Sequence, residues 1–138
     1  MKKLLLPLAL LWLFVVRAHA SELNPFETFR TGLNAFQANG PAALLNAWYS
    51  GDTETKISEI RGRLAALSER LGPVVETEAF EPKALGKRVT RLYGVIYFKK
   101  RPLWIRADYY VADGAGGFIA LEFSTKPEDI LPIDVGIR

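Results

Sequence analysis

The sequence predicts an α+β domain in which three N-terminal helices pack on one face of a curved antiparallel sheet of four strands, or of five if the C-terminal residues add an edge strand. Two observations support this fold class. Apolar residues recur at helical spacing as far as Leu71 and alternate from Val74 onward, and short turn-forming segments separate the last strands. Helices first and strands second are typical of α+β folds with a segregated helical layer.

Cap residues and prolines mark the limits of the three predicted helices. Asn24 and Pro25 open the first helix, which ends at Asn39-Gly40, and residues 41–50 form the second. The third helix, over residues 52–72, has the clearest apolar stripe and stops at a Gly-Pro pair. The apolar faces of all three need a surface to cover, and we expect the sheet to supply it.

The pattern from Val74 onward predicts strands and turns. Strands are predicted near residues 74 to 81, 87 to 99, 102 to 113 and 117 to 124. The last three have short connections, so they form an antiparallel meander. Residues 133–138 again alternate and form either an edge strand or a docked tail, and we expect Ile130 and Leu131 before them to pack on the domain.

The pairing of the strands decides which side chains face the helices. If Phe98 lies opposite Leu103, one face is almost wholly apolar and must be covered by the helices. This inner face comprises Leu92, Ile96, Phe98, Leu103, Ile105, Ala107, Tyr109, Val111, Ile119, Leu121 and Phe123.

The opposite, outer face mixes aromatic and charged side chains, which is typical of sheet faces that pair with another subunit. It comprises Arg91, Tyr93, Val95, Tyr97, Trp104, Arg106, Asp108, Tyr110, Phe118 and Glu122. In this register Asp108 faces Glu122, which costs stability unless Arg91 or Arg106 lies between the carboxylates. A structural ion cluster explains these charges as well as a functional site does.

The first twenty residues are predicted to be a cleavable signal peptide. Lys2 and Lys3 precede an apolar run from Leu4 to Val16, and Ala18-His19-Ala20 has the small residues of a cleavage site. The run is shorter than the roughly 20 residues that span a bilayer. We therefore expect residues 21–138 to be a single mature domain that is periplasmic or secreted.

The composition of the mature chain excludes several kinds of chemistry. Eighteen basic residues less Lys2, Lys3 and Arg17 leave fifteen, against fifteen acidic ones, so a neutral domain has no electrostatic reason to bind nucleic acid or an anionic membrane. His19 is the only histidine and there is no cysteine. We expect no Ser-His or Cys-His catalysis, no metal site of the usual zinc type and no cofactor.

The order of elements resembles the nuclear transport factor 2-like superfamily, within the cystatin-like α+β rolls. The resemblance also rests on the pattern from Asn34 to Trp48-Tyr49, and on the Tyr109-Tyr110 strand followed by a glycine turn and the strand of Phe118. It implies a cone-shaped fold with a pocket between helices and sheet, and frequent homodimers through the outer sheet face.

The first functional hypothesis is a non-catalytic exported domain that binds a small apolar ligand or a protein partner. Core packing explains the pocket residues equally well, since both uses need apolar side chains. The pocket would be lined by Phe26, Phe29, Trp48, Leu92, Ile105, Tyr109 and Leu121. A homodimer interface on the outer face would use Tyr93, Tyr97, Trp104, Tyr110 and Phe118.

The alternative hypothesis is an enzyme that transfers a proton. The superfamily that the chain resembles includes ketosteroid-isomerase-like members, which use a carboxylate base and a tyrosine donor in an apolar pocket. The candidate residues are Asp108, Glu122, Tyr93, Tyr110 and Arg106. The predicted register puts these side chains on the face away from the helices, where that pocket would not lie.

Overall fold

The computed structural model describes residues 24–49 and 55–132, which form three helices followed by an open, curved antiparallel sheet. The α+β class and the order of helices before strands are confirmed. The predicted leader and the start near Ser21 lie outside the described residues. The elements are α2 (Pro25–Asn39), α3 (Pro41–Trp48), α4 (Thr55–Leu71), β1 (Val74–Ala79), β2 (Lys83–Ala84), β3 (Val89–Phe98), β4 (Pro102–Ala112), β5 (Ala115–Ser124) and the 3-10 turn η1 (Pro127–Asp129).

The first helix begins and ends as its sequence predicts. The Asn24 side chain accepts a hydrogen bond from the Glu27 amide at 3.2 Å, and Pro25 occupies the first turn. Gly40 ends the helix with a φ of 89°, in the region that glycine adopts without strain, and its amide donates to the Phe36 carbonyl. No helix in the described ranges is long and apolar enough to cross a membrane.

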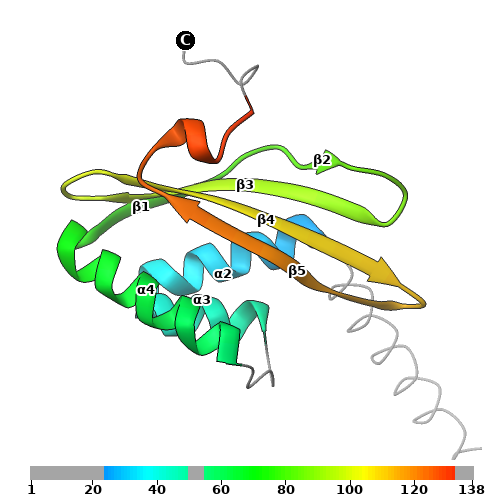
Figure 1. Cartoon of the computed structure of the whole chain (residues 1–138), viewed down its shortest axis with the longest axis horizontal. Coiled ribbons are helices and arrows are strands. Elements are labelled where there is room, and N and C mark those ends of the chain that lie inside the picture. Colours follow the sequence, from blue (N-terminus) through cyan, green and yellow to red (C-terminus); the bar gives the residue numbers. More distant parts are fainter. Residues whose placement is uncertain (1–23, 50–54, 133–138) are drawn as a thin grey trace, which may run out of the picture.

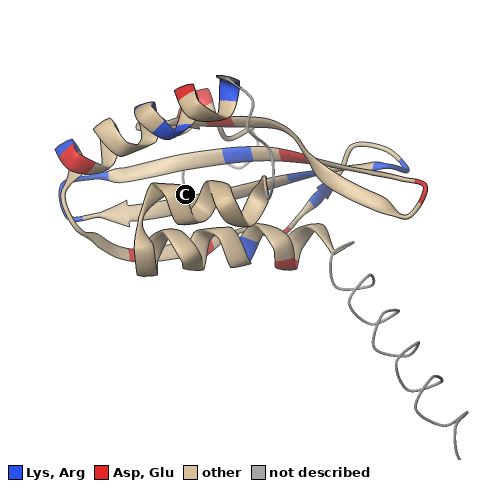
Figure 2. Ribbon diagram, turned by 90° about the horizontal axis from the view of Figure 1, so that it is seen from below, with Lys and Arg blue, Asp and Glu red and all other residues tan. Residues whose placement is uncertain are grey.

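The sheet separates the molecule into two sides. Its strand order is β1-β3-β4-β5, with the short β2 also paired to β3. All three helices lie on one side, and η1 lies on the other (Figure 1). Seen from the helical side, charged residues of both signs mark α4, while α3 carries none (Figure 2). The fifth strand is thus β2, whereas the residues expected to add an edge strand, 133–138, lie outside the described part.

The predicted pairing of Phe98 with Leu103 is wrong by two residues. Ile96 lies opposite Leu103, and Tyr97 lies opposite Pro102. Proline lacks an amide donor but is tolerated as the first residue of a strand, and β4 begins at Pro102 as predicted. A shift of two residues preserves the side to which each side chain points, so the inner and outer faces of β3 and β4 agree with the prediction.

A bulge in β5 overturns the prediction for two neighbouring residues. Asp108 lies opposite Ala120, but Tyr109 lies opposite Phe118, so Ile119 is an extra residue on β5. Phe118 therefore turns inward and is 8% exposed, while Ile119 turns outward and is 62% exposed. Each of the two therefore lies on the face opposite to the predicted one, which was the outer face for Phe118 and the inner face for Ile119.

The core lies between the helices and the inner face of β3, β4 and β5. Phe29 stacks on Trp48 with ring centroids 5.1 Å apart, and the Trp48 indole donates to the Thr28 carbonyl at 3.1 Å. Trp48 can approach α2 this closely because Gly32 has no side chain, since a β-carbon there would lie 1.9 Å from the indole nitrogen. Phe118 closes the other side of the indole at 4.8 Å between ring centroids.

Candidate functional site

The residues predicted to line an inner pocket are brought together, and they pack against one another. Phe29, Leu92, Ile105 and Tyr109 are buried at 2% exposure or less, and Trp48 joins them. Phe26 and Leu121 pack against this cluster while partly exposed. Tyr109 and Phe118 meet edge to face at 5.0 Å. These side chains pack on one another, and core packing is therefore a sufficient explanation for their apolar character.

The first ion pair of the outer face joins the neighbouring strands β3 and β4. Arg91 lies opposite Asp108, and its Nε and Nη2 donate to the two carboxylate oxygens at 2.8 and 3.0 Å. These hydrogen bonds raise the pKa of Arg91 above its usual value, and the negative charge of Asp108 acts in the same direction, against the effect of burial. The fork geometry holds both oxygens of Asp108.

Arg106 forms the second ion pair and ties three segments together. Its Nη2 contacts Oε2 of Glu122 on β5, and its Nη1 donates to the Ile130 carbonyl at 3.2 Å. The expected apposition of Asp108 and Glu122 is therefore wrong, because each carboxylate lies against its own arginine. Ile130 is 2% exposed, so it packs on the domain as predicted, and this packing brings its carbonyl within reach of Arg106.

The five residues of the enzyme hypothesis do not gather in one enclosed apolar site. Both carboxylates are engaged by guanidinium groups, Tyr93 is 7% exposed and Tyr110 is 40% exposed. In the part of the chain that the structure describes, no three or more His, Cys, Asp or Glu side chains are placed to hold a metal ion. The arrangement suits a structural role for Arg91, Arg106 and Asp108 better than proton abstraction.

The predicted interface residues share the outer face, with one exception. Tyr93, Tyr97, Trp104 and Tyr110 lie there, whereas Phe118 faces the core because of the bulge. The indole nitrogen of Trp104 is buried and has no hydrogen-bond partner among the described residues.

Tyr97 is held on this face by a carboxylate on the neighbouring strand. Its hydroxyl donates to Oε2 of Glu78 on β1 at 2.7 Å. This hydrogen bond, followed by burial and the negative charge of Glu78, raises the pKa of Tyr97 to about 12.

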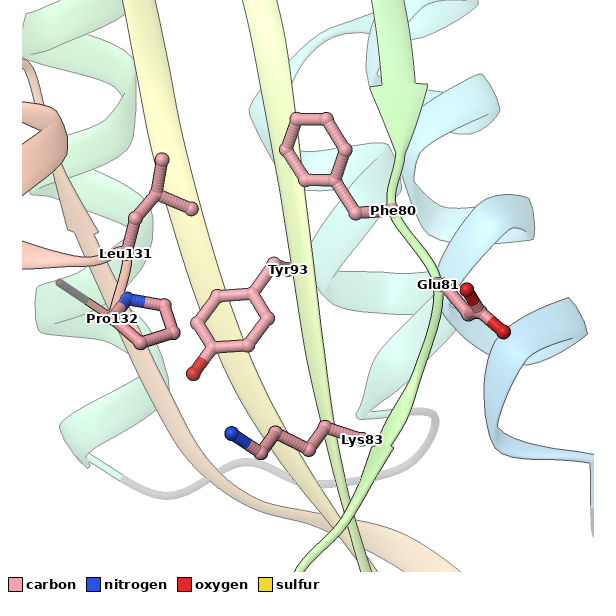
Figure 3. A pocket seen from close by; sticks show the side chains of 6 residues that line it. All are labelled: Phe80, Glu81, Lys83, Tyr93, Leu131 and Pro132. Atoms are coloured by element: carbon pink, nitrogen blue, oxygen red, sulfur yellow. The ribbon is translucent and has the colours of Figure 1, made fainter. Parts of the chain in front are cut away.

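A hollow of about 220 Å³ opens on the outer face, and we call it the outer hollow. The segment after β1 supplies Phe80 and Glu81, β2 supplies Lys83, β3 supplies Tyr93, and the C-terminal segment supplies Leu131 and Pro132. In Figure 3 the Tyr93 ring lies between Leu131 and Pro132 on one side and Phe80 on the other. The Lys83 ammonium extends toward the Tyr93 hydroxyl, and the Glu81 carboxylate points away (Figure 3).

Sequence reasoning identified Tyr93 but missed the rest of the outer hollow. Phe80 stands at the end of a strand, where its ring stacks on that of Trp104 at 6.4 Å. In the sequence Phe80 is a single aromatic residue between Ala79 and Glu81, which gives no direction for the ring. Leu131 and Pro132 were apolar residues in a tail whose position depends on tertiary contacts.

No protein-family model matches the chain, and no curated protein or solved structure is significantly similar to it. The resemblance to the nuclear transport factor 2-like superfamily therefore stays a prediction.

Proposed function

We propose that the mature chain is an exported, non-catalytic binding domain that holds an apolar group of a protein partner in the outer hollow. The observation that carries this proposal is a concave, mostly apolar site on a face that the helices leave uncovered. Phe80, Tyr93, Leu131 and Pro132 supply its apolar walls, and Lys83 supplies a cation.

The size of the outer hollow favours a protein partner over a small ligand. At about 220 Å³ it is smaller than the roughly 300–1,000 Å³ of most small-molecule pockets. A single anchoring side chain is the usual occupant of a small apolar pocket at a protein interface. Tyr110, 40% exposed, and the partly exposed Tyr97 and Trp104 add aromatic surface of the kind enriched in interfaces.

The inner face supports this choice by offering a different explanation for its apolar residues. Phe29, Trp48 and Phe118 form a continuous series of ring contacts at 5.1 and 4.8 Å. Displacing any of these rings for a ligand would expose core surface. A homodimer through the outer face is one form that the protein partnership could take.

The proton-transfer alternative lacks a comparable observation. A general base has to be directed at the bound substrate rather than held against another group of the protein. Asp108 has each oxygen in a hydrogen bond with Arg91, and the carboxylate of Glu122 lies against Arg106. We therefore do not propose an enzymatic function.

The proposal is tested with probes that carry one apolar side chain, namely the acetylated amides of phenylalanine and leucine. Titration of the isotope-labelled mature chain should give saturable chemical-shift changes at the amides of Lys83, Tyr93 and Leu131. Leu131→Asp should abolish these changes because it puts a carboxylate in the apolar wall. Val75→Asp is the matched control, since Val75 is 64% exposed on β1 and should leave binding unchanged.

Two results would contradict the proposal. Shift changes centred on Leu92 and Ile105 would move the site to the inner face and restore the predicted pocket. Equal binding to Leu131→Asp and Val75→Asp, or no saturable change at all, would remove the outer hollow as a binding site.

A further inference from the structure

A second hollow, of about 280 Å³, lies along the outer edge of β5, and we call it the edge groove. It is lined by the consecutive residues 121–124 of β5, by Ile60 and Arg63 of α4, and by Asp129 and Ile130 after β5. Successive residues of a strand point to opposite faces of the sheet. A hollow lined by four successive residues must therefore follow the edge of the strand, between the helical layer and η1.

The edge beside this groove is open to pairing. Among the described strands, β5 has β4 on one side and no neighbour on the other. Natural edge strands are often protected by bulges, and the bulge at Ile119 interrupts β5 before the groove begins. Residues 120–124 follow the bulge and are regularly paired to β4, so the bulge does not protect their free edge.

The two walls of the edge groove differ in chemistry. On the helical side, Leu121 and Phe123 are partly buried, and the Arg63 guanidinium lies 5.4 Å from the centroid of the Phe123 ring. On the outer side, the Glu122 side chain is 58% exposed and Asp129 is also exposed. Among the described residues, Arg106 contacts Oε2 of Glu122 and the Ser124 hydroxyl donates to Oδ2 of Asp129 at 2.8 Å, so the outer wall has two carboxylates and one arginine, while Arg63 belongs to the helical wall.

We propose that the 120–124 edge of β5 is a strand-addition site for an extended segment of another protein in which apolar residues alternate with lysine or arginine. Backbone hydrogen bonds to β5 would supply most of the affinity, as in other cases of strand addition. The alternation matches the groove because apolar side chains would meet Leu121 and Phe123, and basic ones would meet Glu122 and Asp129. This site is distinct from the outer hollow.

A second copy of the chain suits the edge groove less well. Pairing two copies through β5 would bring the Glu122 and Asp129 of both copies to one surface. Like charges placed opposite each other in a sheet destabilise the pairing. A basic segment of a different protein removes that repulsion.

The test uses a short acetylated and amidated peptide of alternating valine and lysine with the isotope-labelled mature chain. Peptide addition should shift the amide signals of residues 120–124 and slow hydrogen exchange at those amides that point away from β4. A peptide with glutamate in place of lysine should bind at least roughly tenfold more weakly because its charges repel Glu122 and Asp129. Methylation of the backbone nitrogens along one edge of the lysine peptide should abolish binding, since it removes the hydrogen-bond donors.

Variants of the protein test whether the charge of Glu122 itself contributes to binding of the lysine peptide. Glu122→Lys should weaken the lysine peptide by roughly tenfold, and Glu122→Gln, which keeps the side-chain length, by about threefold. Glu76→Lys is the matched control, because Glu76 is exposed on β1 at the other side of the sheet. It should leave the affinity unchanged.

Three outcomes would overturn the strand-addition site. The first is equal binding of the methylated peptide, which would mean that side chains alone are held. The second is equal binding of the glutamate peptide. The third is protection of the amides of residues 120–124 that point away from β4 before any peptide is added, together with a dimer in sedimentation, which would identify a second copy as the occupant.

Discussion

The two faces of the sheet are built from the same strands but hold their side chains by different means. On the inner face Leu92, Ile96 and Ile105 are at most 1% exposed and pack against helices. On the outer face Arg91 and Asp108 form a directed ion pair, and the only helical cover in the described ranges is the short η1 with its flanking residues. Close packing against the helices holds the side chains of the inner face. Individual polar contacts hold those of the outer face and leave hollows between them.

Substitutions at the bulge of Ile119 give the largest expected difference in stability between the inner and outer faces. Phe118→Ala should lower the free energy of unfolding by about 3–5 kcal/mol, because it removes a ring that contacts Trp48, Tyr49 and Tyr109. Ile119→Ala should change it by less than about 0.5 kcal/mol, since Ile119 is 62% exposed. Urea unfolding of the chain from Ser21 to Arg138 measures both.

A strand without the bulge would reverse this order, with Ile119 the costly substitution. If Phe118→Ala does not fold, Phe118→Leu provides the smaller truncation of the same side chain. It should still destabilise the protein more than Ile119→Ala.

The glycines of α2 and α4 test how tightly the inner face is packed. Gly32→Ala should destabilise the protein by about 1–3 kcal/mol, because the added carbon collides with the Trp48 indole. Gly62→Ala is the matched helical control, since nothing lies within 4 Å of its added carbon. It should stabilise the protein by about 0.5–1 kcal/mol through helix propensity. Equal effects in thermal unfolding would show that Trp48 adapts, and that the contact is looser than the structure indicates.

The sequence could predict the fold because local signals and the global arrangement agree. Asn24 and Gly40 mark the ends of α2, and alternation along β3 and β4 assigns their side chains to the correct faces. The error in the pairing of β3 and β4 left these faces correct, because a shift of two residues keeps each side chain on the same face. The bulge could not be predicted because Phe118 and Ile119 are both apolar, and either can serve as the inward residue. Only the fit of the Phe118 ring against Trp48 decides between them.

The candidate site was less predictable than the fold for a different reason. The outer hollow joins Phe80, Tyr93 and Pro132, which are far apart in the sequence and carry no shared motif. The edge groove depends on where α4 and η1 flank β5. Composition identified the outer face as unusually aromatic, but concavity arises from tertiary packing, which alternation along a strand does not encode.

The hydrogen bond between Tyr97 and Glu78 provides the smallest and most local test of the outer face. Because this contact raises the pKa of Tyr97 from 10.0 to about 12, the folded protein holds the phenol proton more tightly than the unfolded chain does. The contribution to stability is therefore complete below pH 10.0 and is lost as the pH rises to about 12. The difference in unfolding free energy between the native chain and Tyr97→Phe should shrink over that range.

Glu78→Ala is the control, because it removes the acceptor and should abolish the same pH dependence. The double variant should show no further change, since both substitutions act on one contact. Urea unfolding at pH values from below 10.0 to about 12 measures the difference. If that difference stays constant or grows with pH, then the hydrogen bond does not hold Tyr97 in its protonated form, and this part of the outer face is not fixed by individual polar contacts.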